Sequence, residues 1–273
     1  MKRWISGLLS VSSLIAVTAV SMFAIASSKV SLADAASSPV YSTSPITDIA
    51  YTKTSYQDAK KQLQGLGIEL STTSTMNLSY ASWTSAAQNS DEVLKAAVLL
   101  QQEWLKYDSN TAQKTGIKKI YLVKDLAVNG QYRSGMPEPI YEDALYFDVS
   151  NAYLNSEDGA YMRRTLHHEY KHLIDYNIYG SYDGNAKVWN TCNATGVSYG
   201  NGGGAMYSDP EYAHAVHPKT GFVNGYATSA VEEDMAEVYA ALMTSPEKLQ
   251  QLASRDSVVE CKVNATRATL AKL

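Results

Sequence analysis

The sequence has a low share of positive charge, only two cysteines and, after its N-terminal region, no long apolar stretch. Lys and Arg number 23 against 27 Asp and Glu, which gives a formal net charge of −4. Nucleic acids and anionic membranes are bound by clustered Lys and Arg, so this balance argues against both as partners. Without a second apolar stretch, only the first part of the chain could cross a membrane.

The first 35 residues have the pattern of a signal peptide. Lys2 and Arg3 precede an apolar segment from Leu8 to Ala26, and Ala33-Asp34-Ala35 is a small-residue cleavage signal. A retained anchor is the alternative, but the serines in the segment and the small residues after it favour cleavage. No Cys directly follows the segment, which argues against a bacterial-type lipid anchor. We therefore expect a secreted protein with no membrane association after cleavage.

Removing residues 1–35 takes away three basic side chains and one acidic side chain, which leaves 20 basic and 26 acidic groups and a net charge of −6. Residues 36–50 are rich in Ser, Thr and Pro and predict a flexible leader. We interpret residues 51–273 as one domain, and we expect it to be a monomer.

Cys192 and Cys261 are the only cysteines of the chain. An even number of cysteines in an exported chain permits a disulfide. The bond requires the two Cα atoms to lie within about 7 Å of each other in the fold. If it forms, it ties the region from Asn177 to Ser229, the expected lid, to the C-terminal helix.

The strongest chemical signal is His-Glu-x-x-His, from His168 to His172. No Pro or Gly interrupts 160–179, and apolar residues recur near one stripe, which predicts a helix. His168 and His172 then lie on one face, one turn apart, and can bind one metal ion. Glu169 lies about 100° round the helix, where it can act as general base, as in zinc peptidases. The alternative is a surface helix that carries two histidines by chance. His167 points off the metal face and is interpreted as a packing or capping residue.

Two histidines leave a tetrahedral zinc site one protein ligand short, because the fourth position is kept for water. An extended motif would have a third His at position 178, where this chain has Ile178. Residues 231–243 predict a helix on which Glu233 and Glu237 share one face. One of them can bind the ion while the other supports a ligand from behind. The alternative is a solvated acidic first turn.

These motifs resemble the catalytic domain of anthrax lethal-factor-like peptidases, a group that includes secreted Pro-Pro endopeptidases. The shared features are His-Glu-x-x-His, an Asp three residues later (Asp175), a Tyr seven residues before a Glu (Tyr226 and Glu233), and Glu-x-x-Ala-Glu ending at Glu237. The similarity covers roughly residues 145–250. The family's frequent Gly before the second His is Lys171 here, and we expect this long cation to narrow or recharge the cleft wall.

The resemblance implies a gluzincin site with one zinc ion bound by His168, His172 and Glu233. It implies Glu169 as the base and Tyr226 as a group that assists at the substrate carbonyl. Gly225, directly before this tyrosine, would give the chain the freedom to turn into the cleft. Asp175 and Glu237 are expected to support the metal ligands from behind.

The remaining pattern predicts an α+β fold, a zincin-like metallopeptidase domain. Helices are expected over 55–66, 91–107, 160–179, 231–243, 246–253 and 263–273, and strands over 68–80, 117–128 and 144–149, with a turn at Asn129-Gly130. They would form a twisted mixed sheet, a backing helix, the active-site helix and a C-terminal helical part, with a catalytic core at about 117–255. We predict that 144–150 is the sheet edge that receives substrate; the alternative is an interior strand.

The region from Asn177 to Ser229 holds nine of the sixteen glycines and predicts no helix of useful length. Loops of this length are typical of lids and binding loops. We expect a lid over the cleft whose tyrosines contact substrate. His214 and His217 lie in this region and are interpreted as solvent-exposed rather than as a second metal site.

The sequence thus predicts a secreted zinc endopeptidase that hydrolyses extracellular or cell-surface proteins, with zinc-activated water and Glu169 as general base. Its partner would be a protein or peptide, and the resemblance points to proline-containing sequences. The alternative is an extracellular binding or adhesion protein that kept the fold without turnover. The intact Glu169 argues against it, because a binding protein has no use for a base there. A hydrolase of non-peptide substrates is a further alternative.

Overall fold

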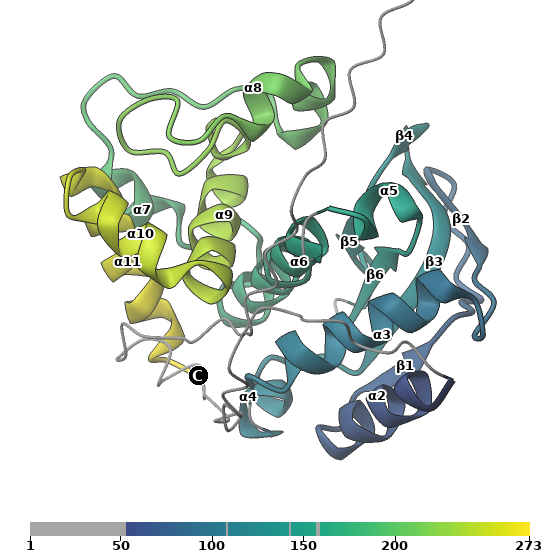
Figure 1. Cartoon of the computed structure of the whole chain (residues 1–273). Helices are drawn as coiled ribbons and strands as arrows, with labels where there is room; N and C mark the ends of the chain where they lie inside the picture. The colour runs from purple at the N-terminus through teal and green to yellow at the C-terminus, as the bar shows by residue number, and fades with distance from the viewer. Residues whose placement is uncertain (1–52, 108, 142, 157–158) are drawn as a thin grey trace, which may run out of the picture.

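A mixed sheet and a group of C-terminal helices lie on opposite sides of one long helix, α6 (Ala160–Tyr179) (Figure 1). The computed structural model describes residues 53–107, 109–141, 143–156 and 159–273. The predicted signal peptide and the leader over 36–50 lie outside this range. No helix of the described part is long and apolar enough to cross a membrane. The fold is α+β, as the sequence predicted.

The first half of the chain contains the sheet and the helices on one of its faces. Its elements are α2 (Lys53–Gly65), β1 (Glu69–Ser71), β2 (Ala81–Ser85), α3 (Asp91–Trp104), α4 (Ser109–Lys114), β3 (Lys119–Val128), β4 (Gln131–Tyr132), β5 (Gly135–Pro137), β6 (Ala144–Asp148) and α5 (Asn151–Leu154). After α6 follow α7 (Ala186–Cys192), the 3-10 helix η2 (Gly203–Ser208), α8 (Pro210–His214), the 3-10 helix η3 (Tyr226–Thr228), α9 (Val231–Thr244), α10 (Pro246–Ala253) and α11 (Ser257–Leu270).

The sheet has the strand order β1-β3-β6-β5, and β2 and β4 pair with β3 beside this path. β3 runs parallel to β1 and β6, whereas β5 runs antiparallel to β6. The predicted turn at Asn129-Gly130 joins β3 to β4. Both of its residues have positive φ, 50° and 76°, as a two-residue hairpin turn of this kind requires. The α2, α3 and α6 side of the sheet forms the main core, and a smaller cluster that includes Tyr146 lies on the other face.

The expectation that 144–150 forms the sheet edge is wrong. β6 lies between β3 and β5, and Gly135 pairs with Phe147 across the last two strands. All five residues of β6 are buried, as expected of an interior strand. The edge is β5, whose three residues include a Gly and a Pro. Such a short strand shows no alternation that a sequence pattern could detect.

Other expected elements are shifted rather than absent. Within 68–80 only β1 is a strand, and the next strand, β2, begins at Ala81. The last helix begins at Ser257 instead of Val263, because the Asp256 carboxylate accepts the N–H groups of the first turn and caps it. α3 is capped by Ser90 and ends at Trp104, three residues before the expected end.

His167 is a packing residue, as predicted, and joins three helices. It is fully buried, its Nε2 lies 2.7 Å from Glu103 Oε2 of α3, and its Nδ1 lies 2.5 Å from Tyr107 Oη. The Tyr107 hydroxyl in turn lies 2.7 Å from that of Tyr239 on α9. Burial lowers the pKa of His167, so its neutral ring donates to Glu103 and accepts from Tyr107. α3, α6 and α9 are thereby held together beside the metal motif.

The disulfide that the sequence permits is present. Cys192 and Cys261 are bonded, with their Cα atoms 5.6 Å apart and a sequence separation of 69 residues. The bond joins the end of α7 to α11.

Candidate metal centre and peptidase cleft

Helix α6 places the three residues of the motif beside a cleft. His168 and His172 are buried, and their Nε2 atoms lie 3.1 Å apart. Glu169 is partly buried, and one of its carboxylate oxygens lies within 4.8 Å of a nitrogen of each imidazole. Burial raises the pKa of the Glu169 carboxyl, although the neighbouring histidines oppose this effect.

Glu233, in the first turn of α9, adds a third atom to this group. Its Oε2 lies 3.0 Å from His168 Nε2 and 3.5 Å from His172 Nε2. A tetrahedral zinc ion with bonds of about 2.0–2.1 Å requires ligand atoms about 3.4 Å apart, close to these three separations. Glu233 Oε2 is buried and has no hydrogen-bond partner among the described residues, which is costly unless a cation occupies the space. The three side chains therefore fit a zinc ion.

The electrostatics of the site also favour positive charge between these groups. Burial lowers the pKa of His168, but Glu233 and Glu237 outweigh this effect and raise it to about 10. For Glu233, burial raises the pKa, and the two histidines lower it to well below its usual range. Such a field suits a divalent cation.

Glu237 lies one turn after Glu233 and behind His168. Its Oε1 is 2.7 Å from His168 Nδ1. Arg164 Nε and Asn224 Nδ2 both donate to Glu237 Oε2, each at 2.6 Å. Burial raises the pKa of Glu237, but Arg164 and His168 together lower it to about 2. A carboxylate in this position orients the imidazole ring of a metal ligand.

Asp175 is fully buried and pairs with Lys171, one turn earlier on α6. The contact that it makes is therefore with a lysine, and its support of the metal ligands stays a prediction. Lys171 is only 1% exposed, and its ammonium faces Asp175 rather than the cleft. The expectation that Lys171 narrows or recharges the cleft wall is wrong, because the two charges neutralise each other inside the protein.

Tyr226 begins η3, and its ring stands edge-on to His168 with the centroids 5.8 Å apart. Gly225 has an ordinary helical φ of −67°, so the expected need for unusual backbone freedom is wrong. The glycine is required by space instead, because a Cβ would lie 1.7 Å from the Tyr212 carbonyl oxygen.

The stretch Gly202-Gly203-Gly204 passes over the same site. A Cβ on Gly203 would lie 2.2 Å from Tyr226 Oη and 2.6 Å from Glu233 Oε1. On the other side, the Gly204 carbonyl accepts a hydrogen bond from Gln131 Nε2 at 3.5 Å. The stretch therefore spans from the α9 side of the site to the β4 side.

A cleft of about 390 Å³ contains these groups. Residues of β5 and α6 line it, and the region 177–229 contributes Tyr182, Gly204, Met206, Pro210, Ala213, His214 and Tyr226. This region therefore lines the cleft, while its role as a lid and the contact of its tyrosines with substrate stay predictions. His214 is exposed as expected but also lines the cleft.

Sequence reasoning missed Arg164, Asn224 and the cleft residue Arg133. Arg164 precedes His168 by four residues, so helical spacing alone could have placed it on the metal face. Asn224 and Arg133 lie in irregular segments or short strands, where no local pattern indicates which side chain reaches the site.

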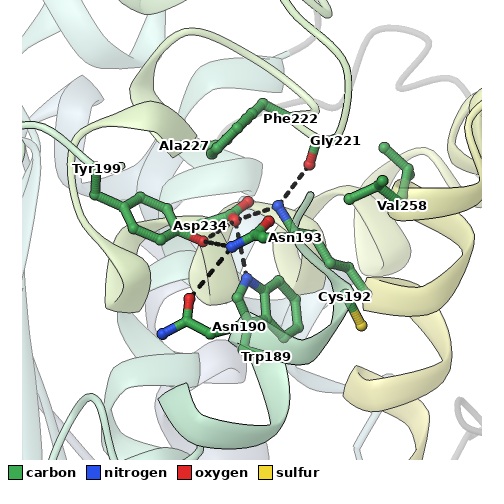
Figure 2. Close-up of polar contacts among 12 residues, drawn as sticks. Trp189, Asn190, Cys192, Asn193, Tyr199, Gly221, Phe222, Ala227, Asp234 and Val258 are labelled. Atoms are coloured by element: carbon green, nitrogen blue, oxygen red, sulfur yellow. Dashed lines mark hydrogen bonds and ion pairs between the residues drawn. The ribbon is translucent and has the colours of Figure 1, made fainter. Parts of the chain in front are cut away.

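Asp234, the neighbour of Glu233, is the centre of a buried polar cluster (Figure 2). Trp189 Nε1, Tyr199 Oη and Lys262 Nζ donate to Asp234 Oδ2 at 2.8, 2.8 and 2.6 Å. The side chains of Asp234 and Lys262 are 0% exposed. The donors come from α7, from the segment after it and from α11, so this Asp234 cluster fixes the first turn of α9 from behind.

The motif on α6, the glutamate on α9 and an edge strand beside them are typical of zinc metallopeptidases of the zincin type. A family model described as "Putative zinc-binding metallo-peptidase" matches residues 88–272, and the chain belongs to this family. The match covers both α6 and α9, and it does not support the lethal-factor-like subtype in particular.

A solved structure is also similar, "a putative zinc-binding metallo-peptidase from Bacteroides caccae ATCC 43185". The two chains are 16% identical, the alignment covers 83% of this chain and 94% of that chain, and the TM-score is 0.47. No curated protein matches the chain.

Proposed function

We propose that the protein is a secreted zinc endopeptidase that hydrolyses peptide bonds of extracellular or cell-surface proteins. The observation that carries this proposal is the convergence of His168, His172 and Glu233, with Glu169 beside them in a cleft bordered by a sheet edge. Membership in a zinc metallopeptidase family supports the hydrolytic chemistry. Export rests on the pattern of the first 35 residues.

A zinc ion held by His168, His172 and Glu233 would supply Lewis-acid activation of water and of the substrate carbonyl. Glu169 takes a proton from the attacking water and passes it to the leaving amine. Its burial supports this role, because a carboxylate with a raised pKa is a stronger base. The Tyr226 hydroxyl donates to the carbonyl oxygen as negative charge develops on it.

The edge strand β5 supports a peptide as the substrate. The Ser134 carbonyl oxygen and the Glu138 N–H group both form hydrogen bonds with residues of β6. Backbone groups alternate in direction along an antiparallel strand, so the N–H and C=O of Gly135 and the C=O of Pro137 face the other side. No strand of the described residues pairs with that side. An extended peptide can therefore add to β5 by backbone hydrogen bonds.

Gly135 also brings this edge close to the base. A Cβ at position 135 would lie 2.8 Å from Glu169 Cγ, so the strand and the base pack against each other at this point. A peptide paired with Gly135 is thereby held beside Glu169. Proline-containing substrates belong to the proposal on the motif resemblance alone, and a peptide-library cleavage profile of the mature chain tests that preference.

The experiment that tests the proposed function compares wild type with Glu169→Gln. Removing a base without removing a ligand lowers kcat by roughly 10²–10⁴-fold, and zinc content stays the same. Peptide hydrolysis and metal content are measured on the same preparations. Equal hydrolysis by the two proteins contradicts the role of Glu169, and peptide binding without cleavage by zinc-loaded wild type favours the alternative of a binding protein.

A second arm tests the strand pairing. Methylating one substrate backbone nitrogen at a time removes one donor each. Only methylation of the nitrogens that pair with the Gly135 and Pro137 carbonyls is expected to raise KM sharply. A uniform response along the peptide contradicts pairing with β5.

A further inference from the structure

Asn224 makes two side-chain contacts that connect separate parts of the site. Its Nδ2 donates to Glu237 Oε2 at 2.6 Å, and its Oδ1 accepts the backbone N–H of Ala227 at 2.9 Å. We propose that Asn224 is a positioning residue that couples the orientation of His168 to the placement of Tyr226. This inference rests on the proposed function, because it assigns His168 to the metal and Tyr226 to the substrate carbonyl.

The first contact leads to the metal. Glu237 lies between Asn224 and His168, with Oε1 2.7 Å from His168 Nδ1. Arg164 contacts both oxygens of the same carboxylate. Asn224 approaches from the chain segment before α9, whereas Arg164 comes from α6. The two donors hold the carboxylate from different elements, so its oxygen cannot turn away from His168 without losing one of them.

The second contact leads to Tyr226. Ala227 follows Tyr226 in η3, a 3-10 helix of three residues. The first N–H groups of a helix have no partner within it, and an Asn side chain before the helix is a preferred acceptor. Asn224 therefore caps the turn that carries Tyr226. A turn this short has few bonds of its own, so loss of the cap changes where the phenol lies.

The backbone of Asn224 is fixed independently of its side chain. Asn224 forms an antiparallel bridge with Val216. The flanking bonds join Gly225 N to Ala215 O at 2.9 Å and His217 N to Val223 O at 3.0 Å. The amide is thus presented from a backbone position that these bonds hold, and it can transmit a displacement between Glu237 and η3.

Only a carboxamide meets both demands at this position. Its NH₂ group faces a carboxylate and its oxygen faces an N–H, which fixes the orientation of the amide. Aspartate keeps the acceptor for Ala227 but places a second negative charge against Glu237. Leucine keeps the approximate volume and removes both hydrogen bonds. The two substitutions therefore separate the two contacts.

The experiment compares Asn224→Asp and Asn224→Leu with wild type and with Asn110→Asp, an exposed site on α4 that controls for the added charge. Zinc dissociation constants are measured by competition with a chromogenic chelator. Loss of a group that supports a metal ligand weakens zinc binding by about 10–100-fold, and this is expected for both Asn224 variants. The visible spectrum of the cobalt-loaded protein is expected to change with His168 orientation, and the control variant is expected to match wild type in both measurements.

Peptide hydrolysis at saturating zinc provides the readout for Tyr226. Asn224→Leu is expected to lower kcat further than Asn224→Asp, with KM unchanged, because only the leucine variant loses the cap of η3. If Asn224→Leu fails to fold, Asn224→Ala replaces it, since alanine also lacks an acceptor for the Ala227 N–H. Equal kcat in the aspartate and leucine (or alanine) variants overturns the link to Tyr226.

A zinc dissociation constant in Asn224→Asp within error of wild type, together with an unchanged cobalt spectrum, overturns the link to His168. These metal measurements require no turnover. If zinc-loaded wild type cleaves no peptide, the proposed function fails, while the link from Asn224 to His168 is still decided by chelator competition.

Discussion

Glu233 and Glu237 lie one turn apart on α9, yet their surroundings give them different roles. Glu233 Oε2 faces the Nε2 atoms of both metal-motif histidines. Glu237 accepts hydrogen bonds from Arg164 and Asn224, and it contacts the other ring nitrogen of His168, Nδ1. Of these two glutamates, Glu233 therefore has the oxygen that is placed to share an ion with the two histidines.

This difference predicts the zinc affinity of two matched variants. Glu233→Ala removes one of the three proposed ligands and is expected to lose zinc at sub-micromolar free metal. Glu237→Ala keeps the ligands and is expected to weaken binding by about 10–100-fold. Metal analysis across a buffered zinc series distinguishes the two. Full zinc occupancy in Glu233→Ala would assign the third ligand to another residue.

The catalytic role of Tyr226 can be tested by removing one heavy atom, its hydroxyl oxygen. If its hydroxyl stabilises the developing charge on the carbonyl oxygen, Tyr226→Phe lowers kcat by roughly 10²–10³-fold, the usual effect of losing one such donor. Zinc content is expected to stay the same, because Tyr226 is not a ligand. A tyrosine that only packs against His168 would tolerate Phe, so near-wild-type kcat rejects the catalytic role.

The residues that the sequence predicted are those whose spacing is local. His168, Glu169 and His172 share one helical turn, and Glu233 and Glu237 share another, so helical geometry alone groups each set. Asn224, Arg133 and Gly135 reach the site through irregular segments and a three-residue strand. Their positions depend on how distant parts of the chain pack, which local periodicity does not encode.

At the scale of elements, the helices could be predicted from the sequence but the edge strand of the sheet could not. α6 and α9 were predictable because their apolar stripes repeat over several turns. That β5 rather than β6 forms the sheet edge was not predictable. The apolar pattern of β6 shows that both of its faces are buried, but it does not show whether another strand pairs with its outer side. The position of β5 brings Gly135 close to Glu169 and Thr165 of α6, a tertiary contact that no local pattern encodes.

The stretch Gly202-Gly203-Gly204, which passes over the site, leads to a prediction at the scale of elements. Gly203→Ala places a methyl group against Tyr226 and Glu233, whereas Gly204→Ala meets only the ends of the Arg133 and Gln131 side chains, both at 3.3 Å. The two variants remove the same backbone freedom from neighbouring positions. Displacing catalytic groups by about 1 Å costs about 100-fold in rate, so Gly203→Ala is expected to lose activity and Gly204→Ala to keep it. Equal kcat/KM values for the two variants would show that a methyl group at position 203 does not displace Tyr226 or Glu233.

At the scale of the whole molecule, the Asp234 cluster connects the metal centre to the far end of the chain. Asp234 follows Glu233 directly, and its donors Trp189 and Lys262 lie close in sequence to Cys192 and Cys261, the two ends of the disulfide. Figure 2 shows Trp189 and Tyr199 converging on the Asp234 carboxylate, with Cys192 nearby. A buried ion pair of this kind depends on every partner staying in place, because an unpaired charge there is strongly destabilising.

The last prediction is therefore that Cys192→Ser/Cys261→Ser weakens zinc binding as well as stability. Closing a loop of 69 residues stabilises the fold by about 4 kcal/mol in the chain-entropy model. Without the bond, α7 and α11 hold Asp234 less firmly, and we expect zinc affinity to fall by about 10-fold, as for other groups that support a metal ligand.

Leu100→Ala is the control for this prediction, because this buried residue of α3 lies outside the Asp234 cluster. Its loss costs about 2–5 kcal/mol and should leave the zinc dissociation constant unchanged at a temperature where the protein stays folded. Chelator competition and thermal unfolding are measured on all three proteins. If both variants lose stability but only the cysteine variant loses zinc affinity, the disulfide acts on the metal centre through Asp234. If both keep the affinity of wild type, the cluster stabilises the fold without positioning Glu233.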